Sequence, residues 1–134
     1  MGSIIDKVAW LHVVDGRILC ARSRGKDTYY IPGGKREAGE TEVETLVREI
    51  EEELSVRVKA KSAVHYGTFE AEAHGKTDGV IVKMSCYTAE ADGELSPASE
   101  IEELAWLTYQ DKGRVSEVSR LIFDRLYDTK QLID

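Results

Sequence analysis

The sequence has little of what marks secreted, membrane-embedded or nucleic-acid-binding proteins. Only two of its 134 residues are cysteine, and no stretch approaches the roughly 18 consecutive apolar residues that a membrane span requires. The formal net charge of −7 leaves lysine and arginine in the minority, whereas binding to polymeric nucleic acid depends mainly on those side chains. The composition therefore argues against a disulfide scaffold, a membrane partner and a polymeric nucleic-acid partner.

The few cysteines and histidines carry no visible chemistry. Cys20 and Cys86 lie far apart in apolar, strand-like runs, so we interpret them as buried core thiols. The three histidines are isolated and lack the spacing of a zinc site.

The first residues show no basic segment followed by a long apolar run, so we expect a cytoplasmic protein. A length of 134 residues, 42% of them hydrophobic, predicts a single domain over residues 1–134.

The first part of the chain predicts strands joined by tight turns. Residues 7–14 and 17–23 are β-prone, and Asp15-Gly16 between them is typical of a hairpin turn in which both positions need positive φ. We therefore expect these two segments to form an antiparallel pair. The Pro32-Gly33-Gly34 run should end strand pairing and begin a loop that reaches about Glu40.

The most regular helical pattern follows this loop. Thr41 is a suitable N-cap residue, and Glu44 three positions later completes a capping box. Apolar residues then recur on one face of a helix with about 3.6 residues per turn, at Val43, Leu46, Val47, Ile50 and Leu54. The pattern predicts an amphipathic helix over residues 41–54.

The second half of the chain consists of β-prone stretches and one further helical pattern. Residues 63–73 and 80–89 pair most simply as a hairpin through a polar turn at 74–79. Shorter β-prone segments occupy 56–60 and 104–107, and residues 114–127 have helical spacing. Few helices, with strands grouped in hairpins, predict an α+β fold: a mixed β-sheet with helices packed on its faces.

Three glutamates of the predicted central helix share one of its faces. At about 100° per residue, Glu49, Glu52 and Glu53 cluster away from the apolar stripe. Their spacing makes the side chains neighbours, so their repulsion opposes the helix unless a cation relieves it. Alternatively, these glutamates are solvated surface residues without a ligand, which is our interpretation of Glu51 on the same helix. Divalent cations on such carboxylates would let an acidic chain bind an anionic substrate.

The surroundings of these glutamates favour the metal site. Five residues separate Gly34 from Glu40, seven separate Glu40 from Arg48, and Arg48 begins the string Arg-Glu-Ile-Glu-Glu-Glu. This pattern closely resembles the Nudix box and matches all but one of its fixed positions. The exception is Ser55, where the family has a glycine suited to a left-handed helix C-cap. The resemblance extends in weaker form along most of the chain.

Resemblance to the Nudix (MutT-like) hydrolases implies an α/β/α sandwich and a metal site. It implies that Glu49, Glu52 and Glu53 bind Mg²⁺, for which Mn²⁺ is a substitute, and that the Gly34 carbonyl is an additional ligand. Elsewhere in the box, Glu40 and Arg48 resemble the family's structural ion pair, which ties the glycine loop to the helix. A planar guanidinium suits this task because it matches a carboxylate.

The resemblance also indicates a proton acceptor and a phosphate contact. Two regions stay open for the general base: Glu52 or Glu53 on the helix, or Glu100 in the loop before the strand at 104–107. Arg22, near the end of the second β-prone segment, resembles a position that contacts substrate phosphates in some relatives. A solvated surface cation is an equal interpretation of Arg22.

The implied reaction is hydrolysis of a nucleoside diphosphate linked to another moiety, by attack of water on phosphorus. The small size of the chain favours a nucleoside triphosphate, including oxidised or non-standard nucleotides, cleaved to the monophosphate and pyrophosphate. ADP-ribose, a nucleotide sugar or a dinucleoside polyphosphate is the alternative. A non-catalytic nucleotide sensor predicts lost carboxylates in the box, and none is lost. We expect a small nucleotide as partner, and a monomer or homodimer.

Overall fold

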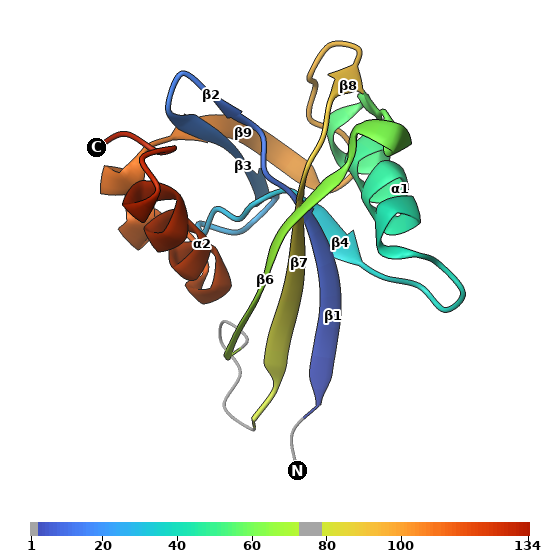
Figure 1. Ribbon diagram of the computed structural model, residues 1–134, viewed down its shortest axis with the longest axis horizontal. Helices are drawn as coiled ribbons and strands as arrows, with labels where there is room; N and C mark the ends of the chain where they lie inside the picture. The colour runs from blue at the N-terminus through green and yellow to red at the C-terminus, as the bar shows by residue number, and fades with distance from the viewer. Residues whose placement is uncertain (1–2, 73–78) are drawn as a thin grey trace.

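The computed structural model describes residues 3–72 and 79–134 (Figure 1). Its strands are β1 (Ile4–Trp10), β2 (Val13–Val14), β3 (Arg17–Ser23), β4 (Gly33–Lys35), β5 (Arg57–Val58), β6 (Val64–Glu72), β7 (Ile81–Thr88), β8 (Ala91–Asp92) and β9 (Ile101–Leu107). Its α-helices are α1 (Glu42–Leu54) and α2 (Glu117–Asp128), and its 3-10 helices are η1 (Ala60–Ser62) and η2 (Tyr109–Arg114).

The central sheet has the strand order β4-β1-β7-β6 and lies between the two α-helices (Figure 1). β1 runs parallel to β7 and antiparallel to β4, and β6 pairs with β7 as the predicted hairpin. Smaller sheets are formed by β2-β3-β9 and by β5-β8. The predicted α+β class, with helices on both sides of a mixed sheet, is confirmed. The turn predicted at 74–79 lies almost wholly outside the described residues.

One predicted strand pair is largely wrong. The Asp15-Gly16 turn is present, with φ of 53° and 78°, but only the two-residue β2 pairs with β3 across it. The longer β1 instead joins β4 and β7, because the chain leaves the central sheet after Trp10. Val8 and Trp10 face one side of the sheet and Ala9 the other, and all three are buried. A strand buried on both faces belongs in the middle of a sheet, with partners on each edge.

The loop predicted from Pro32 also begins later than expected. Gly33 to Lys35 form β4, which pairs with β1 before the chain turns away. Gly33 has φ of 153°, and a Cβ there would lie 2.0 Å from the carbonyl oxygen of Val8. Glycine is therefore needed at this point for a close approach of two backbones rather than for a turn.

Helix α1 forms where the sequence predicts it. Thr41 caps its N-terminus, and Glu44 completes the capping box. Ser55 ends the helix in the left-handed conformation, with φ of 65°, so serine takes the backbone geometry that the family gives to glycine. Its hydroxyl donates to the Ser96 carbonyl at 3.2 Å, which joins the helix end to the loop before β9.

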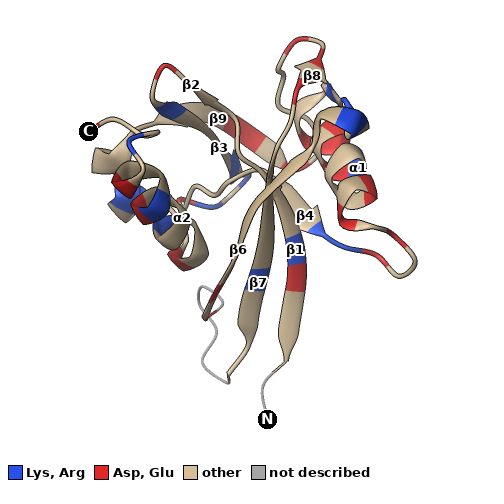
Figure 2. Cartoon of the chain, in the orientation of Figure 1, with Lys and Arg blue, Asp and Glu red and all other residues tan. Residues whose placement is uncertain are grey.

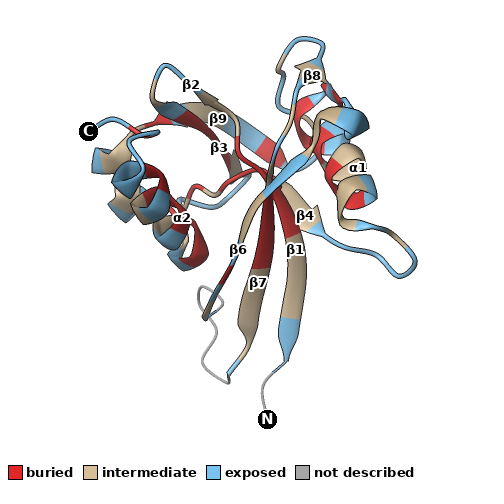
Figure 3. Ribbon diagram, viewed as in Figure 1, coloured by how far each residue is buried: buried red, intermediate tan, exposed pale blue. Residues whose placement is uncertain are grey.

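Two buried clusters fix the helices on the sheet. One packs α1 against one face through Leu46, Ile50 and Leu54, and the other packs α2 against the opposite face (Figure 3). Helix α2 begins at Glu117, three residues later than predicted. Cys20 and Cys86 are buried free thiols, as predicted. In the described ranges, the helices lack the length and apolar character needed to cross a bilayer.

Candidate active site

The three glutamates of α1 differ in exposure. Glu53 is only 4% exposed, because it lies three residues after Ile50 and seven after Leu46, at the border of the apolar stripe. The Glu49 side chain is 16% exposed, whereas that of Glu52 is 56% exposed. The helix therefore directs Glu49 and Glu53 toward the sheet and leaves Glu52 at the solvent side.

A third carboxylate at this site, on an exposed residue, comes from the loop before β9. The backbone N–H groups of Ser96 and Ala98 donate to the carbonyls of Leu54 and Glu53, so this loop is bound to the last turn of α1. Glu100 follows, and its carboxyl lies close enough to that of Glu53 for their interaction to raise the pKa of Glu53 and lower that of Glu100. Chain folding thus places the loop candidate and the helix candidate for the general base side by side.

These carboxylates share a hollow of about 370 Å³ with two lysines. Its lining comprises Lys7, Ser23, Tyr30, Gly33, Gly34, Lys35, Glu49, Glu53 and Glu100. Burial raises the pKa of Glu53 to about 8, and its hydrogen bond from the Gly33 N–H at 3.3 Å opposes that effect. Burial also raises the pKa of Glu49. A cation in this hollow would relieve the cost of ionising both groups.

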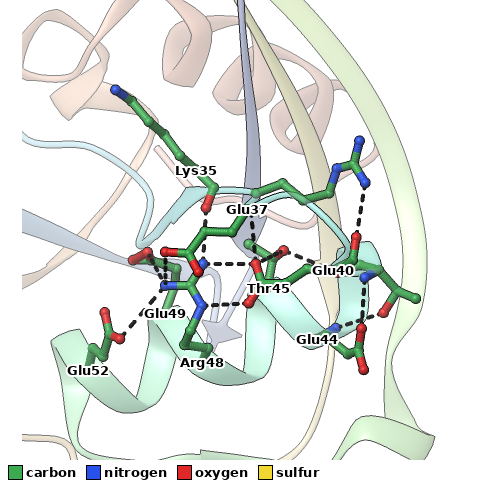
Figure 4. Close-up of polar contacts among 10 residues, drawn as sticks. Lys35, Glu37, Glu40, Glu44, Thr45, Arg48, Glu49 and Glu52 are labelled. Atoms are coloured by element: carbon green, nitrogen blue, oxygen red, sulfur yellow. Dashed lines mark hydrogen bonds and ion pairs between the residues drawn. The ribbon is translucent and has the colours of Figure 1, made fainter.

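Arg48 binds the loop after β4 to helix α1 (Figure 4). Its Nε donates to Glu40 Oε2 at 2.6 Å and its Nη2 to Glu40 Oε1 at 2.9 Å, which is a two-bond pairing. The same guanidinium donates to the Lys35 carbonyl at 3.1 Å and to Glu49 Oε1 at 2.9 Å. Thr45 donates its hydroxyl proton to Glu40 as well. The pair predicted from the box therefore lies within a larger network that also holds Glu49.

Comparison with known proteins identifies the family to which this chain belongs. The model of the NUDIX domain matches residues 6–125. The chain belongs to the Nudix family. A curated relative, the RNA pyrophosphohydrolase of Halorhodospira halophila, is 48% identical over 42 residues, which are 31% of this chain and 23% of the relative. This chain thus spans less than a quarter of that relative's length in the match.

Solved structures share the whole fold at low identity. The MutT NUDIX hydrolase from Burkholderia pseudomallei has a TM-score of 0.76 and 24% identity, with 92% of this chain and 98% of that one covered. The E. coli ORF135 protein has the same TM-score and 22% identity, with 96% and 92% covered. These structures therefore show the same fold as this chain, in agreement with its membership of the Nudix family.

The carboxylates of the Nudix box are the type of ligand that a divalent ion prefers, but their side chains are not arranged around a common point. Hard cations prefer oxygen donors such as carboxylates and backbone carbonyls. A Cβ on Gly34 would lie 2.2 Å from the Glu49 carboxyl carbon, so only glycine leaves room for that carboxylate. Across residues 3–72 and 79–134, however, no three acidic, histidine or cysteine side chains converge as a ready metal site. Glu49 is bound to Arg48 and Glu52 points outward, so metal binding requires these side chains to turn.

A larger cavity of about 560 Å³ adjoins the hollow on the α2 side of the sheet. Four residues line both spaces: Lys7, Ser23, Tyr30 and Gly33. Val82 and Met84 contribute apolar surface to its lining, which also includes the acidic residues Asp27, Glu72 and Glu117, the last at the N-terminal end of α2. The cavity therefore combines an apolar surface with polar groups at its entrance from the hollow, as is usual for small-molecule sites.

Arg22 lies beside the site but is already paired. Its guanidinium donates to Glu103 at 3.0 Å and to Glu102 at 3.2 Å, and Tyr29 donates to the same Glu103 carboxylate at 2.8 Å. Arg22 is not among the residues that line the hollow or the cavity. A phosphate contact by Arg22 would require it to leave these carboxylates, and it stays a prediction.

Sequence reasoning missed the two lysines of the hollow. Lys7 belongs to a β-prone run, and Lys35 directly follows the glycine pair. Burial lowers the pKa of Lys7, while the nearby charges of Glu53 and Glu49 act to raise it. One sequence signal was available: a lysine among apolar strand residues is exceptional, because lysine is rarely buried without a partner.

Proposed function

We propose that this Nudix domain hydrolyses a nucleoside triphosphate to the monophosphate and pyrophosphate with Mg²⁺, or Mn²⁺ in its place. One observation carries the proposal: a hollow with carboxylates and lysines opens toward a cavity large enough for a nucleoside. The carboxylates suit cations, the lysines suit phosphate oxygens, and the apolar surface of the cavity suits a base. Small nucleotides with oxidised or non-standard bases belong to the same class.

The proposed step is attack of water on a phosphorus of the polyphosphate. The water oxygen forms a bond to phosphorus, the bridging P–O bond breaks, and the leaving phosphate takes the electron pair. Glu53 or Glu100 accepts the proton, because both carboxyls line the hollow. Glu49, Glu52, Glu53 and the Gly34 carbonyl would hold Mg²⁺, which would neutralise phosphate charge and lower the pKa of the attacking water. Glu40 and Arg48 keep the ligand helix fixed to its loop.

The substrate class is tested with a panel and a double variant. The panel contains standard and oxidised nucleoside triphosphates, ADP-ribose, a nucleotide sugar and a dinucleoside polyphosphate, each with and without Mg²⁺. A short RNA with a 5′-triphosphate completes it, because the curated relative is named as acting on RNA. We expect release of pyrophosphate from a triphosphate, only with the metal. Faster cleavage of ADP-ribose or a nucleotide sugar would replace the triphosphate assignment.

The double variant Glu52→Gln, Glu53→Gln should fold and lose nearly all turnover. The matched control is Glu51→Gln on the same helix, whose exposed side chain is 3.9 Å from Arg57 and points away from the hollow. This control should keep wild-type turnover. Wild-type rates in the folded double variant would refute the metal-site assignment, and a wild-type protein inactive on the whole panel would favour a non-catalytic sensor.

A further inference from the structure

Two lysines face each other across neighbouring strands of the central sheet. Lys7 on β1 and Lys35 on β4 are direct partners in the antiparallel register, so their side chains project from the same face. Figure 2 shows basic positions on both strands where they run side by side. Like charges directly opposite each other destabilise a sheet. A pair of this kind is therefore expected to have a ligand that compensates it.

A lysine on the other face of the same sheet shows the ordinary arrangement. Lys83 on β7 has Asp6 of β1 and Glu70 of β6 as its direct register partners, so an acidic residue lies on each side of it. Lys7 instead has Met84 of β7 and Lys35 of β4. Lys7 is half-buried, and among the residues that the structure describes it forms no hydrogen bond. Its ammonium is attracted by the charges of Glu53 and Glu49 in the hollow but is hydrogen-bonded to neither carboxylate.

The position of Lys7 identifies the acceptor. Lys7 lines both the carboxylate hollow and the 560 Å³ cavity. If the nucleoside occupies the cavity and the diphosphate meets the metal ions in the hollow, the phosphate attached to the nucleoside lies where the two spaces meet. An ammonium at that junction is within the region that this phosphate must occupy, and it carries the complementary charge.

We propose that Lys7 binds the phosphate that stays with the nucleoside, so that it holds the monophosphate product as well as the substrate. The inference rests on the proposed function, since it assumes a nucleotide that spans the hollow and the cavity. Lys35 adds to the positive charge beside Lys7. A charge-assisted hydrogen bond of this kind changes affinity by at least about tenfold.

The test is binding of product without metal. Wild type, Lys7→Met and Lys83→Met are titrated by calorimetry with AMP, GMP, CMP and UMP in EDTA buffer, and then with the four nucleosides that lack the phosphate. We expect Lys7→Met to raise the Kd of the tightest-binding monophosphate at least about tenfold. The Kd of the corresponding nucleoside should stay at its wild-type value. Lys83→Met removes the same charge from the opposite face and should change neither affinity.

Stability measurements separate binding from folding. Lys7→Met should melt at the wild-type temperature or higher, because it removes repulsion from Lys35 and adds an apolar side chain beside Met84. If Lys7→Met fails to fold, Lys7→Gln is compared in its place. Equal monophosphate affinity in a folded Lys7 variant would overturn the inference, and so would a wild type that binds none of the four monophosphates.

The two proposals fail in different ways. A wild type that turns over no substrate, but whose monophosphate binding depends on Lys7, would refute the hydrolysis and leave the phosphate contact standing. A wild type that turns over a triphosphate, with Lys7→Met unchanged in product affinity and KM, would refute the phosphate contact alone.

Discussion

Replacement of Gly34 by alanine should separate activity from stability. Gly34 lies in β4 without positive φ, so alanine adopts its backbone conformation readily. The new Cβ would lie 2.2 Å from the carboxyl carbon of Glu49 and 2.3 Å from one of its oxygens. Ordinary contact begins at 3.4 Å, so the carboxylate must retreat by about 1.2 Å. The substitution acts on a metal-ligand candidate while the strand itself is preserved.

The structure sets the size of both effects. The clashing atoms are at the end of a flexible side chain, so the clash should lower the free energy of unfolding by less than about 1 kcal/mol. Alanine also reduces the conformational entropy of the unfolded chain, which should restore about 0.4–1 kcal/mol of that loss. The melting temperature should therefore stay within about 4 °C of wild type. A displacement of about 1 Å in a catalytic group costs up to about 100-fold in rate. We expect Gly34→Ala to lower kcat/KM by about 10- to 100-fold.

The measurements are thermal unfolding and kcat/KM over a range of Mg²⁺ concentrations. Gly113→Ala is the matched control, because a Cβ there meets no atom within 4 Å and the backbone needs no positive φ. It should change neither quantity. Wild-type kcat/KM in Gly34→Ala would refute the place of Glu49 in the metal site. A fall of more than about 8 °C in its melting temperature would show that the carboxylate does not absorb the clash.

Three further predictions concern α1 and the residues directly before and after it. Arg48→Ala should lower both the melting temperature and kcat/KM, the latter by at least about tenfold, because Glu40 loses its partner; an unchanged melting temperature would count against the pair. Hydrogen bonds from Arg48 lower the pKa of Glu40 from its ordinary 4.5 to about 2. The stability that Glu40 provides is therefore complete above pH 4.5 and lost as pH falls toward 2, so urea unfolding of Glu40→Gln should depend less steeply on pH in that range. Ser55→Gly should be about 1 kcal/mol more stable than Ser55→Ala, because both lose the hydroxyl but only alanine is strained at φ of 65°. Equal midpoints in denaturant would contradict the left-handed C-cap.

Local patterns account for what the sequence predicts well. Helix α1 follows from the capping box of Thr41 and Glu44 and from its apolar spacing, all within one segment. The Asp15-Gly16 turn and the β6–β7 hairpin likewise depend on residues close in the chain. The burial of Glu53 was not predicted, because the helical wheel grouped it with Glu49 and Glu52 away from the apolar stripe, whereas its position seven residues after Leu46 places it at the border of that stripe.

Pairings between distant segments were not readable. No sequence signal near β1 indicates that it pairs with β7 instead of β3, since its partner residues in β7 lie more than 70 positions away in the chain. The resemblance marked Glu100 as a candidate for the base. Its contact with Glu53 depends on loop N–H groups that bind the last carbonyls of α1. The partner of Lys7 on β4 depends on the same kind of non-local register.

The distribution of charge over the central sheet indicates what the site binds. Toward α1, Lys83 lies between Asp6 and Glu70, and the opposite charges stabilise the sheet. Toward α2, Lys7 lies beside Lys35 while carboxylates gather at the same hollow. Each group of like charges costs stability alone, and each is relieved by a ligand of opposite sign: a divalent cation for the carboxylates and a phosphate for the lysines. A polyphosphate that arrived with its metal ion would relieve both, and such a ligand is what the proposed function requires.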